Sequence, residues 1–177
     1  MKRNWWMVAL LPIFYTSAVA SEVKFADIIV QSFIKSDANV YMQKVAPTFE
    51  EYFEVRQKIR SHEKLDINRT KDAYSRDYED IVEDWASVKA KMLRENIDFS
   101  KVKFIDSGRQ EDRRLAKTLD RDTLRYIFLN FSQGDILFTI KLKECVKFED
   151  WKCGEGMSFK KFEIEDSASS ASSANTN

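Results

Sequence analysis

Hydrophobic residues recur every three or four positions through the first half of the chain, a spacing that predicts amphipathic helices. One apolar stripe runs along residues 22–36, and Ser36-Asp37 interrupts it. This dipeptide is suited to cap a second, shorter helix. That helix has to stop before Pro47, because a residue that precedes proline disfavours the helical conformation. The pattern therefore predicts two consecutive helices before position 47.

Thr48 and Glu51 have the spacing of a capping box, in which each side chain accepts a hydrogen bond from the backbone of the other residue. A third helix is expected to begin there and to reach about Arg60, with its apolar residues on one side. Residues 61–69 are polar and predict a loop.

A long helix is predicted from residue 71 to about residue 95, because large apolar residues repeat every three or four positions there. Acidic residues crowd its first half and basic residues its end, an order that complements the helix dipole. The acidic run could be interpreted as a cation site, but a solvated helix face explains it more simply. The apolar stripe consists of Tyr74, Tyr78, Ile81, Trp85, Val88 and Met92.

After position 100 the helical spacing gives way to alternation and to aromatic and branched residues, which predict β-strands. The charged stretch 108–122 predicts either a loop or an exposed strand with a turn. Turns are expected at Gln133-Gly134-Asp135 and near Glu149-Asp150. The expected strands are 101–107, 123–132, 136–145, the return arm 151–153, and 157–165.

The order of these elements, helices first and strands afterwards, predicts an α+β fold in which N-terminal helices pack on a C-terminal antiparallel sheet. The length of 177 residues gives room for one domain. Residues 21–166 are expected to form that domain. Residues 167–177, SASSASSANTN, contain no apolar cluster and predict a disordered tail.

The first twenty residues have the three parts of a secretory signal peptide. Lys2 and Arg3 make a positive start, residues 5–15 form an apolar run, and Ala18 and Ala20 are small residues at the positions that signal peptidase recognises. A membrane anchor is the alternative, but the run is shorter than the roughly 20 residues that a spanning helix needs. We therefore expect cleavage after Ala20, no membrane span in the mature protein, and a periplasmic or secreted location.

The two cysteines lie on the two arms of a predicted hairpin. Cys145 and Cys153 flank the turn around Glu149-Asp150, where facing residues come close enough for a disulfide in an oxidising compartment. The alternative is a redox-active pair, which usually requires Cys-x-x-Cys at a helix N-terminus, and the sequence has neither feature. We expect a structural disulfide.

The helical and strand segments together resemble a known superfamily. The segment FADIIVQSFIKSDANVYMQKVAPTFEEYFEV and the later TIKLKECVKFEDWKCGEGMSF are similar to secreted bacterial proteins of the NTF2-like and cystatin-like superfamily. The resemblance covers about residues 23–165. It implies a cone in which a curved sheet wraps around helices. Members include isomerases, dehydratases, immunity proteins and pure binding domains, so the fold alone assigns no function.

Composition and motifs exclude several classes of function. Lys and Arg number 29 and Asp and Glu number 29, so the formal net charge is zero and a dedicated nucleic-acid binder is not expected. One His and two Cys leave almost nothing for a metal site, and we expect no cofactor. The chain has no Gly-x-Ser-x-Gly, no His-Glu-x-x-His and no phosphate loop. The acidic residues leave a two-carboxylate glycosidase open, although nothing singles out a pair.

His62 and two larger sets of side chains are the candidates for chemistry or binding. His62 lies in a polar stretch, where an exposed histidine is a simpler interpretation than a catalytic base. Four basic residues could clamp a phosphate, although interleaved acids weaken their field; they are Arg109, Arg113, Arg114 and Arg121. Aromatic residues would line an internal pocket if the fold encloses one, and plain core is the alternative; they are Tyr74, Tyr78, Trp85, Tyr126 and Phe138.

Two function classes remain. The first is an exported, soluble, non-enzymatic binding or interaction protein of the cell envelope, such as an immunity-type protein that binds one protein partner tightly. The second is a small-molecule-binding or lyase/isomerase-like protein that takes a small hydrophobic ligand into an internal cone pocket. The second class predicts a buried carboxylate whose pKa is raised by desolvation. A filled interior favours the first class. No catalytic residue is singled out.

Overall fold

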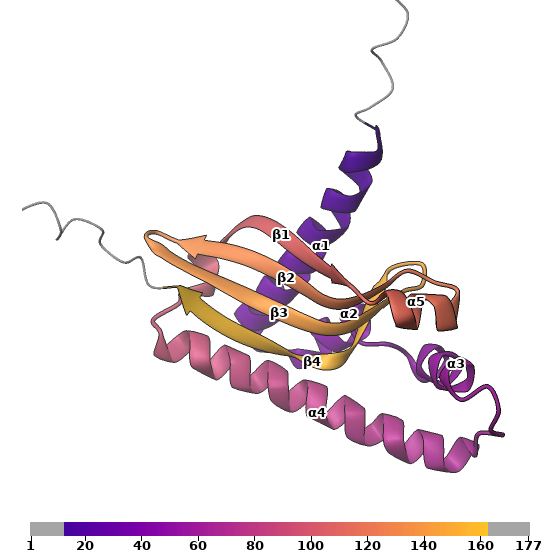
Figure 1. Ribbon diagram of the computed structural model, residues 1–177. Coiled ribbons are helices and arrows are strands. Elements are labelled where there is room, and N and C mark those ends of the chain that lie inside the picture. The colour runs from indigo at the N-terminus through magenta and orange to yellow at the C-terminus, as the bar shows by residue number, and fades with distance from the viewer. Residues whose placement is uncertain (1–12, 163–177) are drawn as a thin grey trace, which may run out of the picture.

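The computed structural model describes the backbone of residues 13–162 and the side chains from residue 22 onward (Figure 1). Helices precede strands except for one short helix between the first two strands, so the α+β class is confirmed. The elements are α1 (Ile13–Lys35), α2 (Ala38–Val45), α3 (Phe49–Ile59), α4 (Ile67–Arg94), a 3₁₀ turn η1 (Phe99–Lys101), β1 (Lys103–Glu111), α5 (Arg113–Leu119), β2 (Thr123–Gln133), β3 (Ile136–Lys147) and β4 (Trp151–Phe162).

The first helix is longer than its apolar stripe predicts. α1 begins at Ile13 and passes through the expected cleavage point after Ala20 without a break in its backbone. Residues 1–12, the rest of the expected signal peptide, lie outside the described residues, so cleavage stays a prediction. The second helix is confirmed: the Asp37 side chain accepts a hydrogen bond from the Asn39 amide at 2.9 Å and caps α2.

The long helix begins earlier than predicted. The expected loop over 61–69 is wrong in its last three residues, because α4 starts at Ile67 and ends at Arg94. Asp66 explains the difference, since its carboxylate accepts hydrogen bonds from the amides of Asn68 and Arg69 at 2.8 and 3.2 Å. A polar first turn can belong to a helix when such a cap precedes it.

The charged stretch 108–122 also differs from both expectations. Its first part completes the exposed strand β1, but residues 113–119 form the helix α5 rather than a loop or a turn. Asp112 caps this helix by accepting from the Leu115 amide at 2.9 Å. Asp120 ends it in the left-handed conformation with φ 52°. Leu119 is fully buried, so one turn of α5 is anchored in the protein.

The four strands form an antiparallel meander in the order β1-β2-β3-β4. The predicted arm 151–153 and the predicted strand from 157 are parts of one strand, β4, which the structure describes as far as Phe162. Register shifts occur between Phe104 and Asp106, between Gln110 and Glu111, and between Leu142 and Lys143. Such bulges bend strands and increase twist, and the strands curve visibly in Figure 1. The expected tail 167–177 lies outside the described residues.

The predicted disulfide is confirmed. Cys145 and Cys153 are directly opposite each other on β3 and β4, with their Sγ atoms 2.18 Å apart and their Cα atoms 4.0 Å apart. Both residues are fully buried. The bond therefore ties the two strands together at the end of the hairpin that carries the turn.

One face of the sheet is covered by helices. α1 and α2 lie behind the strands in the view of Figure 1, and α4 runs along the β4 edge. Phe33 of α1 packs against α4 and η1, since its ring centroid lies 5.5 Å from that of Trp85 and 5.2 Å from that of Phe99. Strands β2 and β3 contribute Phe131 and Phe138, which stack at 5.4 Å. Burial of these side chains supplies the main driving force for folding.

Helix α4 approaches β4 unusually closely at a glycine. A Cβ atom on Gly156 would lie 1.6 Å from Oδ2 of Asp84 and 3.0 Å from its Cβ. Because only a residue without a side chain fits there, Gly156 sets the distance between the helix and the sheet. Nearby, the hydroxyl group of the fully buried Tyr41 has no hydrogen-bond partner among the described residues. Its burial and the neighbouring Asp84 carboxylate raise the pKa of Tyr41.

Candidate functional site

The aromatic residues expected to line an internal pocket do not share one. Trp85 and Phe138 are buried in the core between the helices and the sheet. The Trp85 indole N–H donates to Oγ of Ser32 at 2.8 Å, which satisfies its polar group within the core. Tyr74 and Tyr78 lie nearer the N-terminal end of α4, with ring centroids 6.0 Å apart, and the Tyr74 hydroxyl donates to the Pro47 carbonyl at 3.1 Å.

Tyr126 lies on the other face of the sheet. Its neighbour Ile127 and its near neighbour Leu129 are fully buried against the helices, whereas Tyr126 and Phe128 are half-buried and lie beside each other at 5.8 Å. None of the five expected wall residues lines any of the cavities described below.

The arginines expected to clamp a phosphate are largely engaged with carboxylates. Arg109 pairs with the buried Glu22 of α1. Arg113 lies 3.2 Å from Glu111. Arg121 is directed toward α3 rather than toward the other arginines, and Arg114 is exposed.

The widest cavity of those described lies beside the end of β1. It has a volume of about 740 Å³ and is open and polar, and both Arg109 and Arg113 line it. Glu111, Asp112 and Asp122 also line it. Cations and carboxylates therefore share its surface, and no single sign of charge dominates there. This balance gives the cavity little selectivity for an anion.

The face of the sheet opposite the helices is the first candidate site. Alternation along the strands directs one residue in two away from the core, and no helix of the described part of the chain lies in front of β1, β2 and β3 in Figure 1. We call this surface the open face. At its centre is a groove of about 490 Å³ lined by Gly108, Phe128, Asn130, Thr139, Lys141, Ser158, Lys160 and Phe162.

Lysines and aromatic rings are interleaved on the open face. Nζ of Lys141 lies 4.7 Å from the ring centroid of Tyr126, and Nζ of Lys160 lies 5.5 Å from that of Phe162. These two lysines are the only charged residues that line the groove within the described part of the chain. Its neutral polar groups are occupied, since Asn130 donates to Asp106 at 2.6 Å and accepts a hydrogen bond from Thr139. The groove of the open face is therefore lined by basic and aromatic residues.

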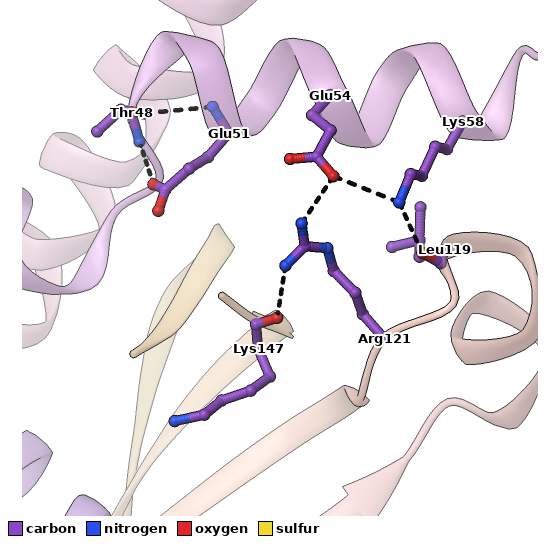
Figure 2. Close-up of polar contacts among 7 residues, drawn as sticks. All are labelled: Thr48, Glu51, Glu54, Lys58, Leu119, Arg121 and Lys147. Carbon is purple, nitrogen blue, oxygen red and sulfur yellow. Dashed lines mark hydrogen bonds and ion pairs between the residues drawn. The ribbon is translucent and has the colours of Figure 1, made fainter. Parts of the chain in front are cut away.

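A second candidate lies at the opposite end of the sheet, where α3 is held against α5 and the sheet. Figure 2 shows that Glu54 of α3 accepts from Nη2 of Arg121 at 2.8 Å, and that Arg121 reaches toward the Lys147 carbonyl. Lys58 lies 3.3 Å from the same carboxylate oxygen of Glu54 and donates to the Leu119 carbonyl at 3.0 Å. The Arg121 guanidinium holds the pKa of Glu54 below its ordinary value.

The predicted capping box at the start of α3 is confirmed. The Glu51 amide donates to Oγ1 of Thr48 at 3.2 Å, and the Thr48 amide donates to Oε2 of Glu51 at 2.8 Å (Figure 2). Both ends of α3 are therefore fixed by polar contacts, although only Tyr52 of this helix is buried. The helix is positioned by its caps and ion pairs more than by a hydrophobic face.

A cleft of about 210 Å³ lies beneath α3, and we call it the α3 cleft. Apolar groups from three parts of the chain line it, and carboxylates lie among them. The lining residues are Pro47, Glu51, Tyr52, Val55, Arg56, Ile59, Leu115, Glu144, Val146, Phe148, Lys152, Gly154 and Glu155. This cleft was not expected from the sequence, because α5 supplies one wall and was not predicted as a helix.

Glu144 is the unusual residue of the α3 cleft. It has a positive φ of 46°, a conformation that non-glycine residues rarely adopt. Partial burial raises the pKa of the Glu144 carboxyl, and the Glu155 and Asp112 carboxylates raise it further. Arg56 and Arg125 act in the opposite direction without cancelling the rise. The cleft thus holds a carboxyl group that is harder to ionise than an ordinary glutamate.

Neither a metal site nor a membrane span is found in the described region. Residues 13–162 contain no group of three or more His, Cys, Asp or Glu residues placed to hold a metal ion. The helices described there are too short or too polar to cross a bilayer.

The chain matches no protein-family model, no curated protein and no solved structure.

Proposed function

We propose that this chain is an exported, non-enzymatic binding protein and that it recognises a partner protein through the open face of its sheet. The observation that carries the proposal is the difference between the two faces. The covered face is filled by packed rings such as Phe131 and Phe138, while the open face presents Phe128, Lys141 and Lys160. A filled interior has no room for a substrate, whereas an aromatic surface with lysines is suited to a second macromolecule.

The chemistry of the open face favours an acidic protein segment as its partner. Lys141 and Lys160 give the groove a positive charge, which complements Asp or Glu side chains. Phe128 and Phe162 offer apolar contact area between these charges. Aromatic residues, phenylalanine among them, are enriched in protein interfaces. The partner we propose is an acidic segment that also carries an apolar side chain.

The second function class, an internal pocket for a small hydrophobic ligand, has less support. Its pocket was expected among the side chains of Trp85, Phe138 and Tyr126, which lie in the core or on opposite faces of the sheet. The proposal therefore assigns no catalytic residue and no cofactor.

Two further parts of the proposal rest on the sequence. The charged start at Lys2 and the small residues at Ala18 and Ala20 support export to the periplasm or the exterior. Membership of the NTF2-like and cystatin-like superfamily, with its cone, is proposed from the segments quoted above. The antiparallel sheet with helices on one face is compatible with that membership.

Site-specific photo-crosslinking tests the proposed binding surface. A photoreactive phenylalanine analogue replaces Phe128 in the full-length chain, which is expressed in its own cells and irradiated. We expect one predominant protein adduct, because Phe128 lies at the centre of the open face. The control carries the analogue in place of Leu93, an apolar residue of α4 that is 53% exposed. That position is expected to give no discrete adduct.

The identity of the crosslinked protein, and its affinity for the wild-type and variant chains, decide the outcome. The purified adduct protein should bind the wild-type chain, and the variant Lys141→Glu/Lys160→Glu should bind it at least tenfold more weakly, because like charges then face each other. Equal adducts at positions 128 and 93, or equal affinity for both forms of the chain, would contradict the proposal. A nucleic-acid adduct at position 128 would show that the open face binds a nucleic acid, and the proposed protein partner would be wrong.

A further inference from the structure

The α3 cleft belongs to neither face of the sheet and plays no part in the proposed protein binding. Most of its wall is apolar: Val55 and Ile59 come from α3, Leu115 comes from α5, and Val146 and Phe148 come from the end of β3. A cleft of about 210 Å³ can hold one hydrophobic ring or a short aliphatic chain. The wall therefore favours a ligand with a small apolar body.

Several charged groups of the α3 cleft are already engaged. Arg56 donates to a carboxylate oxygen of Asp77 at 3.2 Å, and Lys152 donates to the Lys44 carbonyl at 3.2 Å. Glu51 accepts from the backbone at the start of its own helix, as the capping box requires. These contacts hold the three groups in place, and Arg56 only partly offsets the negative charge at Glu144.

Glu144 and Glu155 are the two remaining charged residues of the lining. Within residues 13–162, neither carboxylate takes part in a hydrogen bond or an ion pair, and the Glu155 carboxylate raises the pKa of Glu144. The two residues are neighbours across the β3–β4 ladder, because the backbone of Glu155 lies opposite that of Lys143, the residue before Glu144. A cation placed between them would gain two charge-assisted contacts and remove the repulsion.

We propose that the α3 cleft binds an amphipathic cation, a primary amine or guanidinium group attached to a small hydrophobic body. The apolar body lies between Ile59, Leu115 and Val146, and the cationic head lies between Glu144 and Glu155. The occupant follows from charge complementarity. The apolar wall selects the body, and the head is selected by the two carboxylates, which have no hydrogen bond or ion pair among the described residues.

The walls of the α3 cleft are held in place before any ligand arrives. Figure 2 shows the contacts of Glu54 with Arg121 and of Lys58 with the Leu119 carbonyl, which join α3 to the end of α5. The Cys145–Cys153 disulfide joins the two strands that carry Glu144 and Glu155. A preformed cavity costs less conformational entropy to occupy than one that must be ordered on binding.

A titration followed by NMR tests the inference with three probes of similar shape. The probes are 4-phenylbutylamine, 4-phenylbutanol and 4-phenylbutyrate, which differ in the charge of the head group. The uniformly ¹⁵N-labelled chain is expected to bind the amine with a millimolar Kd, as its size permits. The alcohol should bind about tenfold more weakly, and the carboxylate should not bind measurably. Amide shifts should change at Leu115, Val146 and Gly154.

Two variants locate the head and the body of the probe. Glu144→Gln/Glu155→Gln is expected to weaken binding of the amine about tenfold, since two charged acceptors are lost. The matched control is Glu79→Gln/Glu83→Gln, which removes two exposed carboxylates of α4 and should leave the Kd unchanged. Leu115→Trp should abolish binding of all three probes while both carboxylates remain, because the indole fills the space for the body.

The inference fails under three outcomes. Equal affinity for the amine and the carboxylate would remove the role of charge. Shift changes confined to the open face would place the ligand elsewhere and leave the α3 cleft without a function. An amine affinity that is unchanged in Glu144→Gln/Glu155→Gln, in a variant with a native spectrum, would also overturn it. None of these outcomes bears on protein binding at the open face, which the crosslinking experiment decides separately.

Discussion

The two faces of one sheet are built from the same strands and differ in almost every physical property. On β2, Ile127, Leu129 and Phe131 are at most 1% exposed and pack beneath the helices. Between them, Phe128 and Asn130 are half-buried on the open face. The difference teaches that alternation along a strand assigns a role to each residue. One set of positions stabilises the fold, and the other is free to serve binding.

The largest effect is expected on the covered face, from Trp85→Ala. Loss of the indole leaves a cavity against Phe33 and removes the hydrogen bond to Ser32. The free energy of unfolding should therefore fall by about 3–5 kcal/mol. Denaturation by urea measures the change. Leu93→Ala, on the exposed side of the same helix, should cost less than about 1 kcal/mol. Similar losses for the two variants would show that α4 is not held by its covered side.

The second-largest effect is expected from the disulfide that joins β3 and β4. Replacing Cys145 and Cys153 by alanine should lower the free energy of unfolding by about 2–3 kcal/mol, because the unfolded chain is no longer constrained. Adding dithiothreitol to the wild-type protein should reproduce most of the loss. The reductant should leave the double variant unchanged. If the reductant destabilises neither protein, the disulfide contributes nothing to stability.

Alanine substitutions at two glycines, one on each face of the sheet, test how closely each face is packed. Gly156→Ala places a Cβ against Asp84 of α4 and should cost about 1–3 kcal/mol, because helix and strand must separate. Gly108→Ala on the open face meets nothing closer than the Phe128 ring at 3.7 Å and should be nearly neutral. Thermal unfolding of the two variants makes the comparison. A greater loss for Gly108→Ala would reverse the roles assigned to the faces.

The smallest effect concerns Glu144 and its dependence on pH. A carboxyl whose pKa is raised in the folded protein holds its proton more tightly there than in the unfolded chain. Stability therefore falls as pH rises from the ordinary value of 4.5 through the raised pKa. Glu144→Gln should match the wild type near pH 4 and exceed it at pH 7, by less than about 1 kcal/mol because solvent screens the group. A variant whose stability relative to the wild type stays constant or falls as pH rises would contradict the raised pKa.

Much of the fold could be predicted where a single local signal decides the structure. Asp37 and the Thr48–Glu51 pair marked helix starts, and the alternation after Gly134 marked β3. The helix α5 could not be predicted with the same ease, because it has only seven residues and three of them are charged. Its available signal was the Asp112 cap, followed by Leu115 and Leu119 four residues apart.

The candidate sites were harder to predict because they depend on the tertiary arrangement. Tyr126 and Phe138 are both aromatic strand residues, yet the register pairs Phe138 with Phe131 and Tyr126 with Lys143, so their rings lie on opposite faces. The α3 cleft depends on a positive φ at Glu144 and on the helix α5, where the sequence predicted a loop or an exposed strand. Sequence periodicity assigns faces within one strand, but it does not show which segments meet.

The most direct test of the difference between the faces is one pair of substitutions on one strand. Phe131→Ala and Phe128→Ala remove the same ring from β2 at positions three residues apart, one on the covered face and one on the open face. Urea denaturation should show a loss of about 3–5 kcal/mol for Phe131→Ala and less than about 1 kcal/mol for Phe128→Ala. Equal losses would mean that the ring on the open face serves the fold, and the proposed binding surface would lose its basis.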